Sequence, residues 1–112
     1  MIKILDYEGK LVSENKRLIK TKQGRFAISK EYRLIKQAYM YSVKNIKLEK
    51  PYKIRIEAKT RKDIDNIIKP ILDSLEAKKV IENDRYVTYL EVVKNKVGKG
   101  QKESVQVYAI DL

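Results

Sequence analysis

The chain has 112 residues, of which 26 are Lys or Arg and 15 are Asp or Glu, and its formal net charge at pH 7 is +11. It contains no His and no Cys, which excludes the usual zinc sites, a Cys nucleophile, a Ser-His-Asp triad and disulfides. Any metal must therefore be held by oxygen ligands, which favours Mg²⁺ or Mn²⁺. The positive charge predicts a polyanionic partner, with nucleic acid ahead of an anionic membrane surface; lysines that only solubilise the surface are the alternative.

A length of 112 residues fits one domain over 1–112. No stretch approaches the roughly 18 apolar residues that a membrane helix needs, and the opening MIKILDYEGK lacks the apolar segment of a signal peptide. We therefore expect a cytoplasmic protein that associates with the nucleoid through DNA and has no membrane partner.

The first half of the chain predicts three short strands and one helix. The strands are expected at 2–5, 17–20 and 25–28, the last two being joined by a turn that contains a glycine. A helix is expected over 29–47, because apolar side chains recur there at helical spacing and Ser29 is a suitable N-cap.

The second half begins with the clearest strand, 51–59, in which apolar and charged residues alternate so that one face is core and the other is charged. A second helix is expected over 66–79. Proline inside a helix costs about 3 kcal/mol, so we expect the regular helix to begin near Pro70, with 66–69 as an irregular entry.

Two further strands are expected at 86–94 and 104–110, joined by a basic hairpin loop around 96–100. The predicted order is strand, short strands, helix, strand, helix, strand, strand. This order predicts a small α+β domain in which two main helices pack on a mixed β-sheet.

An acidic pair interrupts the basic stretch between the predicted strand and the second helix. Asp63 and Asp65 are spaced i and i+2, so that in extended backbone they point to one side, roughly 6–7 Å apart, and can converge on one cation. Ile64 between them is expected to face the core. Acids at this place weaken phosphate binding unless a cation bridges them to the phosphate, and such an ion can also polarise a phosphodiester. The alternative is that both acids only form a turn and cap the helix.

Two more residues complete the candidate site. Asp84 lies at the start of the next strand, where a returning chain can bring it beside Asp63 and Asp65 as a third ligand; alternatively it is a turn residue together with Asn83. Lys69 follows Asp65 by four residues and can reach the same site to hold a phosphate or stabilise transition-state charge. Its alternative role is that of a solvated surface lysine.

These segments resemble a known family. The runs RKDIDNIIKPILDSL (61–75), IENDRYV (81–87) and VVK (92–94) look like those of the RusA-type Holliday-junction resolvases, and the loop at 13–17, the turn at 24–25 and YKIRIE (52–57) agree in order. The resemblance implies a homodimeric, Mg²⁺-dependent endonuclease, with Mn²⁺ as a substitute ion, that nicks two strands symmetrically across a four-way DNA junction in recombination and repair.

The resemblance also implies roles for individual residues. Asp63, Asp65 and Asp84 would be the metal-binding catalytic acids and Lys69 the essential lysine. Many relatives have an acid at the position of Asn83, so no metal role is assigned to that residue. The residues expected to contact DNA are Asn15, Lys16, Arg17, Arg61, Lys62, Asn66 and Lys69.

Two other interpretations compete with this one. Glu57-Ala58-Lys59 matches the E-x-K of restriction-type nucleases, which also needs an acid on a neighbouring strand, but the motif arises easily by chance when 37% of residues are charged. A non-catalytic basic nucleic-acid-binding module would use its acids only to cap a helix. For a resolvase, two symmetric cuts by a chain with one site favour a two-fold dimer, in which Tyr39, Tyr41 or apolar residues of the first helix are candidate contacts.

Overall fold

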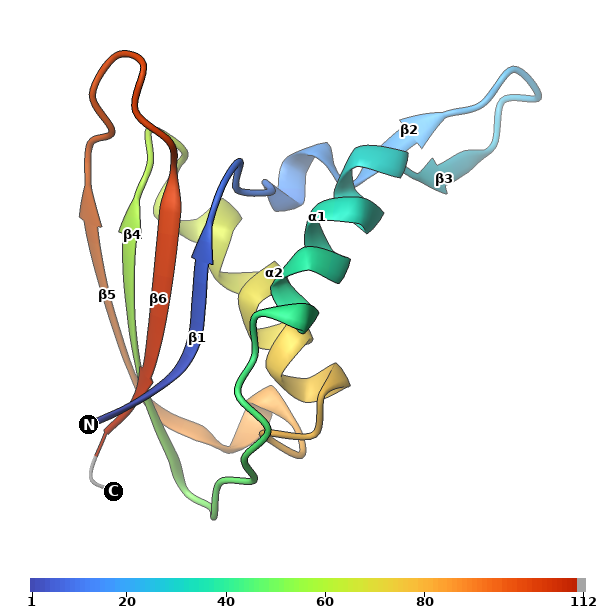
Figure 1. Cartoon of the computed structure of the whole chain (residues 1–112). Coiled ribbons are helices and arrows are strands. Elements are labelled where there is room, and N and C mark those ends of the chain that lie inside the picture. Colours follow the sequence, from blue (N-terminus) through green and yellow to red (C-terminus); the bar gives the residue numbers. More distant parts are fainter. Residues whose placement is uncertain (111–112) are drawn as a thin grey trace.

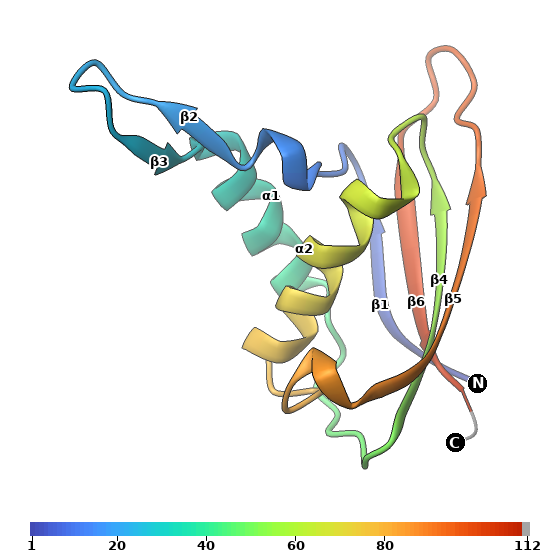
Figure 2. The same cartoon turned by 180° about the vertical axis from the view of Figure 1, so that it is seen from behind.

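The computed structural model describes residues 1–110 and is built from a four-stranded mixed sheet with two helices on one side of it (Figures 1 and 2). The sheet order is β1-β6-β4-β5. The predicted α+β class, with two main helices packed on a mixed sheet, is therefore confirmed. No helix within residues 1–110 is long and apolar enough to cross a membrane.

The central strand β4 (Tyr52–Lys59) pairs antiparallel with β6 (Ser104–Ala109) and parallel with β5 (Val87–Asn95). Its alternating pattern is realised as predicted, with Ile54 and Ile56 fully buried. The fourth strand, β1 (Ile2–Glu8), pairs antiparallel with β6 at the edge.

The predicted hairpin between the last two strands is wrong. β5 and β6 are not neighbours, because β4 lies between them and pairs with both. The helix that follows β4 carries the chain back along the sheet, which makes β5 parallel to β4. The loop after β5 then has to pass the end of only one strand, a span of roughly 10 Å, to reach the position of β6.

The first helix, α1 (Lys30–Tyr41), starts where predicted, and the side chain of Ser29 caps it by accepting a hydrogen bond from the Tyr32 amide. It ends six residues before the predicted boundary at 47, because the Lys44 amide donates to the Ile4 carbonyl of β1 at 2.7 Å instead of continuing the helix. Tyr39 is fully buried, which removes it as a candidate dimer contact, whereas the side chain of Tyr41 is 81% exposed.

The second helix, α2 (Ile64–Ala77), begins well before Pro70, which lies inside it, so the predicted irregular entry over 66–69 is wrong. Loss of one backbone hydrogen bond at the proline is outweighed by complete burial of Ile67, Ile71 and Leu75, each of which contributes about 1.5–3 kcal/mol. Ile64 is 40% exposed, contrary to the expectation that it faces the core.

The two short strands near the amino terminus are confirmed as an antiparallel pair, β2 (Leu18–Lys20) and β3 (Phe26–Ile28), preceded by a short 3-10 helix, η1 (Glu14–Lys16). This pair forms a separate two-stranded sheet that projects from the body of the molecule (Figure 1). A second 3-10 turn, η2 (Asp84–Tyr86), leads into β5.

Candidate active site

The loop from the end of β4 to the start of α2 is anchored by Glu103. Its carboxylate accepts hydrogen bonds from the Thr60 hydroxyl, from Lys62 Nζ at 3.0 Å and from the Leu11 amide at 3.1 Å. Burial alone would raise the pKa of Glu103, but these hydrogen bonds outweigh it and the pKa is lowered. A charged Glu103 therefore holds three segments together beside the predicted acids.

Asp63 occupies the N-cap position of α2, but its side chain makes no capping hydrogen bond. The side chains of Ser29 and Asn83 do cap, at the starts of α1 and η2. The exposed carboxylate of Asp63 is thus available to a ligand, in contrast to what the helix-capping alternative expects.

Asp65 and Lys69 lie one helical turn apart on α2, and Asp73 lies one turn further on. Lys69 Nζ is 2.9 Å from Asp73 Oδ1 and 3.1 Å from Asp84 Oδ2. The hydrogen bond to Asp73, followed by that to Asp84, raises the pKa of Lys69. The side chain therefore carries a positive charge at neutral pH, which suits binding of phosphate oxygens and does not suit a general base.

Asp84 opens η2, with its side chain 32% exposed. The neighbouring Asn83 takes the turn role, since its Oδ1 accepts from the Arg85 amide at 2.9 Å, and the Asp84 carboxylate points to Lys69 instead. Within residues 1–110, carboxylate oxygens of Asp73, Glu76 and Asp84 come within 4.8 Å of one another, while Asp63 and Asp65 do not belong to that group.

The structure thus brings Asp84 to Lys69 and places Asp63 and Asp65 at the start of the same helix. Because β4 and β5 are parallel, Asp63 follows the end of one strand and Asp84 precedes the start of the other, at opposite ends of the sheet. The prediction missed Asp73 and Glu76. Both could have been found from their spacing. They follow Lys69 by four and seven residues, which places them on the same side of the helix as Lys69.

The residues expected to contact DNA differ in their surroundings. Lys16, Arg17 and Arg61 are exposed, whereas Asn66 is half-buried and Lys62 is held by Glu103. The Asn15 side chain accepts a hydrogen bond from Ser13, Arg17 lies 3.5 Å from Glu14, and Arg61 Nε donates to the Val97 carbonyl at 3.4 Å.

The E-x-K alternative finds no support in the sheet. Glu57 stands opposite Gln106 on β6 and Val93 on β5, so neither neighbouring strand places an acid directly across from it. Its carboxylate instead lies 3.3 Å from Arg55 Nε on the same strand.

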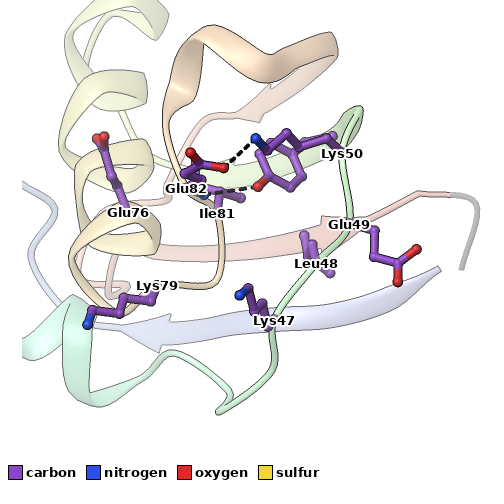
Figure 3. Close-up of a pocket in the computed structure, with 9 residues that line it drawn as sticks. Lys47, Leu48, Glu49, Lys50, Glu76, Lys79, Ile81 and Glu82 are labelled. Atoms are coloured by element: carbon purple, nitrogen blue, oxygen red, sulfur yellow. Dashed lines mark hydrogen bonds and ion pairs between the residues drawn. The ribbon is translucent and has the colours of Figure 1, made fainter.

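A pocket of about 870 Å³ lies between the 47–50 segment and the end of α2 (Figure 3). Two of its polar contacts are internal: Lys50 pairs with Glu82, and the Glu82 amide donates to the Tyr52 hydroxyl at 3.0 Å. None of the predicted site residues lines it. We therefore place the candidate active site at α2 and η2.

The family model of endodeoxyribonuclease RusA matches residues 8–108 of the chain. No curated protein gives a match. The RusA family comprises divalent-metal-dependent endodeoxyribonucleases that act on branched DNA junctions. The matched range includes Asp63 and Asp65 at the start of α2, and also Lys69 and Asp84. Because the match covers most of its length, the chain belongs to the RusA endodeoxyribonuclease family.

Proposed function

We propose that this chain is a structure-selective endodeoxyribonuclease that resolves four-way DNA junctions by paired, symmetric hydrolysis in recombination and repair. The observation that carries the proposal is the Asp63 carboxylate, which stands at a helix N-cap without capping it, in a chain whose match to the RusA family spans residues 8–108. Asp65 on the same helix and the contact between Lys69 of α2 and Asp84 of η2 support it.

We propose Mg²⁺ as the cofactor, with Mn²⁺ as a substitute, with Asp63 and Asp65 as ligands at the start of α2 and Asp84 as a ligand beside Lys69. Carboxylate oxygens are the ligands that such hard ions prefer, and the chain has no His or Cys to recruit a softer one. A bound divalent ion supplies Lewis-acid stabilisation of phosphate charge and lowers the pKa of water. Asp63 and Asp65 are exposed at the start of α2, where the helix dipole also favours negative charge.

Lys69 provides the fixed positive charge of the site. Asp73 and Asp84 hold its ammonium group from two elements, so that it is oriented before substrate arrives. In this role it binds a non-bridging oxygen of the scissile phosphate and stabilises the charge that develops there.

We further propose that the protein acts as a homodimer. Each chain has one such site, and a four-way junction is resolved only when two strands of like polarity are cut. A two-fold axis places two identical sites symmetrically on a substrate that itself has approximate two-fold symmetry.

Cleavage of a synthetic four-way junction tests the proposal. Asp63→Asn, Asp65→Asn and Asp84→Asn are each expected to abolish Mg²⁺-dependent cleavage while leaving binding intact or tighter, because one negative charge near phosphate is lost. Asp6→Asn is the matched control: Asp6 is an exposed acid on β1 that pairs with Lys3, and its loss should not affect cleavage.

Cleavage by the wild-type protein in EDTA, or full activity in the three variants, would overturn the assignment. Wild-type protein that binds junctions but never cuts them, with or without Mg²⁺, would identify a non-catalytic binding module instead. Fork and linear duplex substrates, assayed in parallel, measure the selectivity for branched DNA.

A further inference from the structure

The β2–β3 hairpin is a defined structural element that extends away from the sheet and the helices in both views (Figures 1 and 2). Its turn is closed by hydrogen bonds from the Gly24 amide to the Thr21 carbonyl at 3.0 Å and from the Thr21 amide to the Arg25 carbonyl at 2.7 Å. Gly24 has φ +79°, a conformation that glycine adopts without strain. The backbone of the hairpin is therefore held by its own hydrogen bonds.

Residues 15–30, which contain this hairpin, have no Asp or Glu. All the cations of this segment are exposed. In the described part of the chain, only Arg17 among them takes part in an ion pair, with Glu14. The cations are Lys16, Arg17, Lys20, Lys22, Arg25 and Lys30.

Several cations on the sheet and around the candidate site are paired instead. Lys62, Lys69 and Arg55 each pair with at least one carboxylate. In the 15–30 segment, by contrast, five of the six cations form no ion pair within residues 1–110, and no acid lies among them. Such a surface is complementary to a polyanion.

A pocket lies at the base of the hairpin, between the hairpin and the candidate active site. It has a volume of about 460 Å³ and contains the cations Arg17, Arg33, Lys36 and Lys69 but only one acid, Asp73. Arg17 and Ile28 of the pocket belong to the hairpin and its entry, while Lys69 belongs to the candidate site. Positive charge therefore continues from the hairpin tip to Lys69.

We propose that the β2–β3 hairpin and the pocket at its base form a DNA-backbone-binding arm, which holds one duplex arm of the substrate beside Lys69. The inference rests on the proposed function for the identity of the polyanion. Exposed apolar side chains on the hairpin, such as Leu18 and Phe26, fit this role because they can pack on sugars and base edges.

A second copy of the chain is the other occupant that an exposed apolar hairpin suggests. Two hairpins facing each other would bring together two segments that each contain cations and no acid. Like charges in contact oppose association, whereas phosphate neutralises them. The charge pattern therefore favours DNA.

Binding to a four-way junction in EDTA, measured over a range of salt concentrations, tests the arm without requiring cleavage. The variant is Lys20→Gln/Lys22→Gln/Arg25→Gln, and the matched control is Lys44→Gln/Lys47→Gln/Lys78→Gln, which removes the same charge from exposed residues at the other end of the helices. Each lost phosphate contact reduces the slope of log K against log salt by about 0.9. We expect the hairpin variant to lose up to about 2.7 in slope and at least about tenfold in affinity at ~0.1 M salt, and the control to change little.

The single variant Lys22→Gln at the tip should lose about 0.9 in the slope of log K against log salt. Both hairpin variants should unfold at the same temperature as the wild-type protein. Equal losses in the hairpin variant and the control would overturn the inference, as would an oligomer that dissociates in the hairpin variant, which would identify the hairpin as a contact between copies. Wild-type protein that does not bind DNA would overturn the inference and the proposed function together. A wild-type protein that binds through the hairpin but does not cut would overturn the proposed function alone.

Discussion

Asp73 connects two lysines that come from different helices. Its Oδ1 lies 2.9 Å from Lys69 Nζ on α2 and its Oδ2 lies 3.8 Å from Lys36 Nζ on α1. One half-buried carboxylate thus orients the active-site lysine and contributes to the contact between the two helices. Sequence reasoning identified Lys69 and Asp84 from spacing and family resemblance, but their mutual contact depends on how η2 packs on α2, which no local pattern encodes.

Glu103 is the residue whose charge most directly supports the active-site loop, and its replacement gives a pH-dependent prediction. Glu103→Gln is expected to lower the free energy of unfolding by about 1–3 kcal/mol near neutral pH, because hydrogen bonds to a charged acceptor are lost. The folded-state pKa of Glu103 lies below the ordinary value for a glutamate, so this stabilisation is fully present above the ordinary value and disappears as the pH falls through the folded-state pKa. The difference between wild type and variant should therefore shrink between about pH 7 and about pH 3 in urea titrations.

Glu49→Gln is the control for this experiment, since Glu49 is exposed and forms no salt bridge within the described chain. It should leave unfolding unchanged at both pH values. A Glu103→Gln protein as stable as wild type near neutral pH would show that the network around Thr60 and Lys62 does not stabilise the loop.

At the scale of elements, β4, α2 and β5 form the unit that positions the site. β4 ends at Lys59, and a short loop leads to Asp63 at the start of α2. The helix carries Lys69 and Asp73, and η2 follows it before the chain enters β5. α2 is held by its buried face, so its packing determines where every charged group on its other face lies.

Leu75→Ala tests how far the molecule depends on this packing. Leu75 is fully buried, and its truncation is expected to cost about 2–5 kcal/mol, a large part of the ~5–15 kcal/mol typical of small domains. Leu34→Ala on α1 removes the same atoms from a side chain that is 55% exposed and should change stability by less than about 0.5 kcal/mol. Equal effects of the two substitutions, measured by urea unfolding, would contradict the burial of α2.

Most elements could be predicted because local patterns determine them. Alternation defines β4, and the Ser29 cap defines the start of α1. The neighbours of β5 could not be predicted, since a basic loop of this length serves equally for a hairpin or for passing one strand. The start of α2 was missed because the penalty at Pro70 is local, while the compensating burial of Ile67 and Ile71 is visible only in the folded chain.

At the scale of the whole molecule, a net charge of +11 opposes the binding of any cation. Positive charge is concentrated along the hairpin and the pocket at its base, and acids gather on one side of α2 and at η2. A divalent cation can therefore bind only where local carboxylates overcome the global repulsion.

Stabilisation by Mg²⁺ is a sensitive test of this arrangement that needs no substrate. A ligand that binds the folded state stabilises it by RT ln(1 + [L]/Kd), about 1.4 kcal/mol at tenfold excess over Kd, which corresponds to a rise in Tm of about 4–8 °C for a domain near this size. We expect Mg²⁺ to raise the Tm of the wild-type protein above that in KCl of equal ionic strength. Screening of surface charge alone would act equally in the two salts.

Two variants then locate the ion on α2. Asp65→Asn should abolish the Mg²⁺-specific rise in Tm, because Asp65 is a proposed ligand at the start of the helix, while Glu76→Gln should retain it. Glu76 is the informative comparison, since its carboxylate lies within 4.8 Å of Asp73 and Asp84 in the group that excludes Asp63 and Asp65. The reverse pattern, with the rise lost in Glu76→Gln and kept in Asp65→Asn, would contradict the proposed ligands and place the ion beside Asp73, about 12 Å further along the helix axis than Asp65.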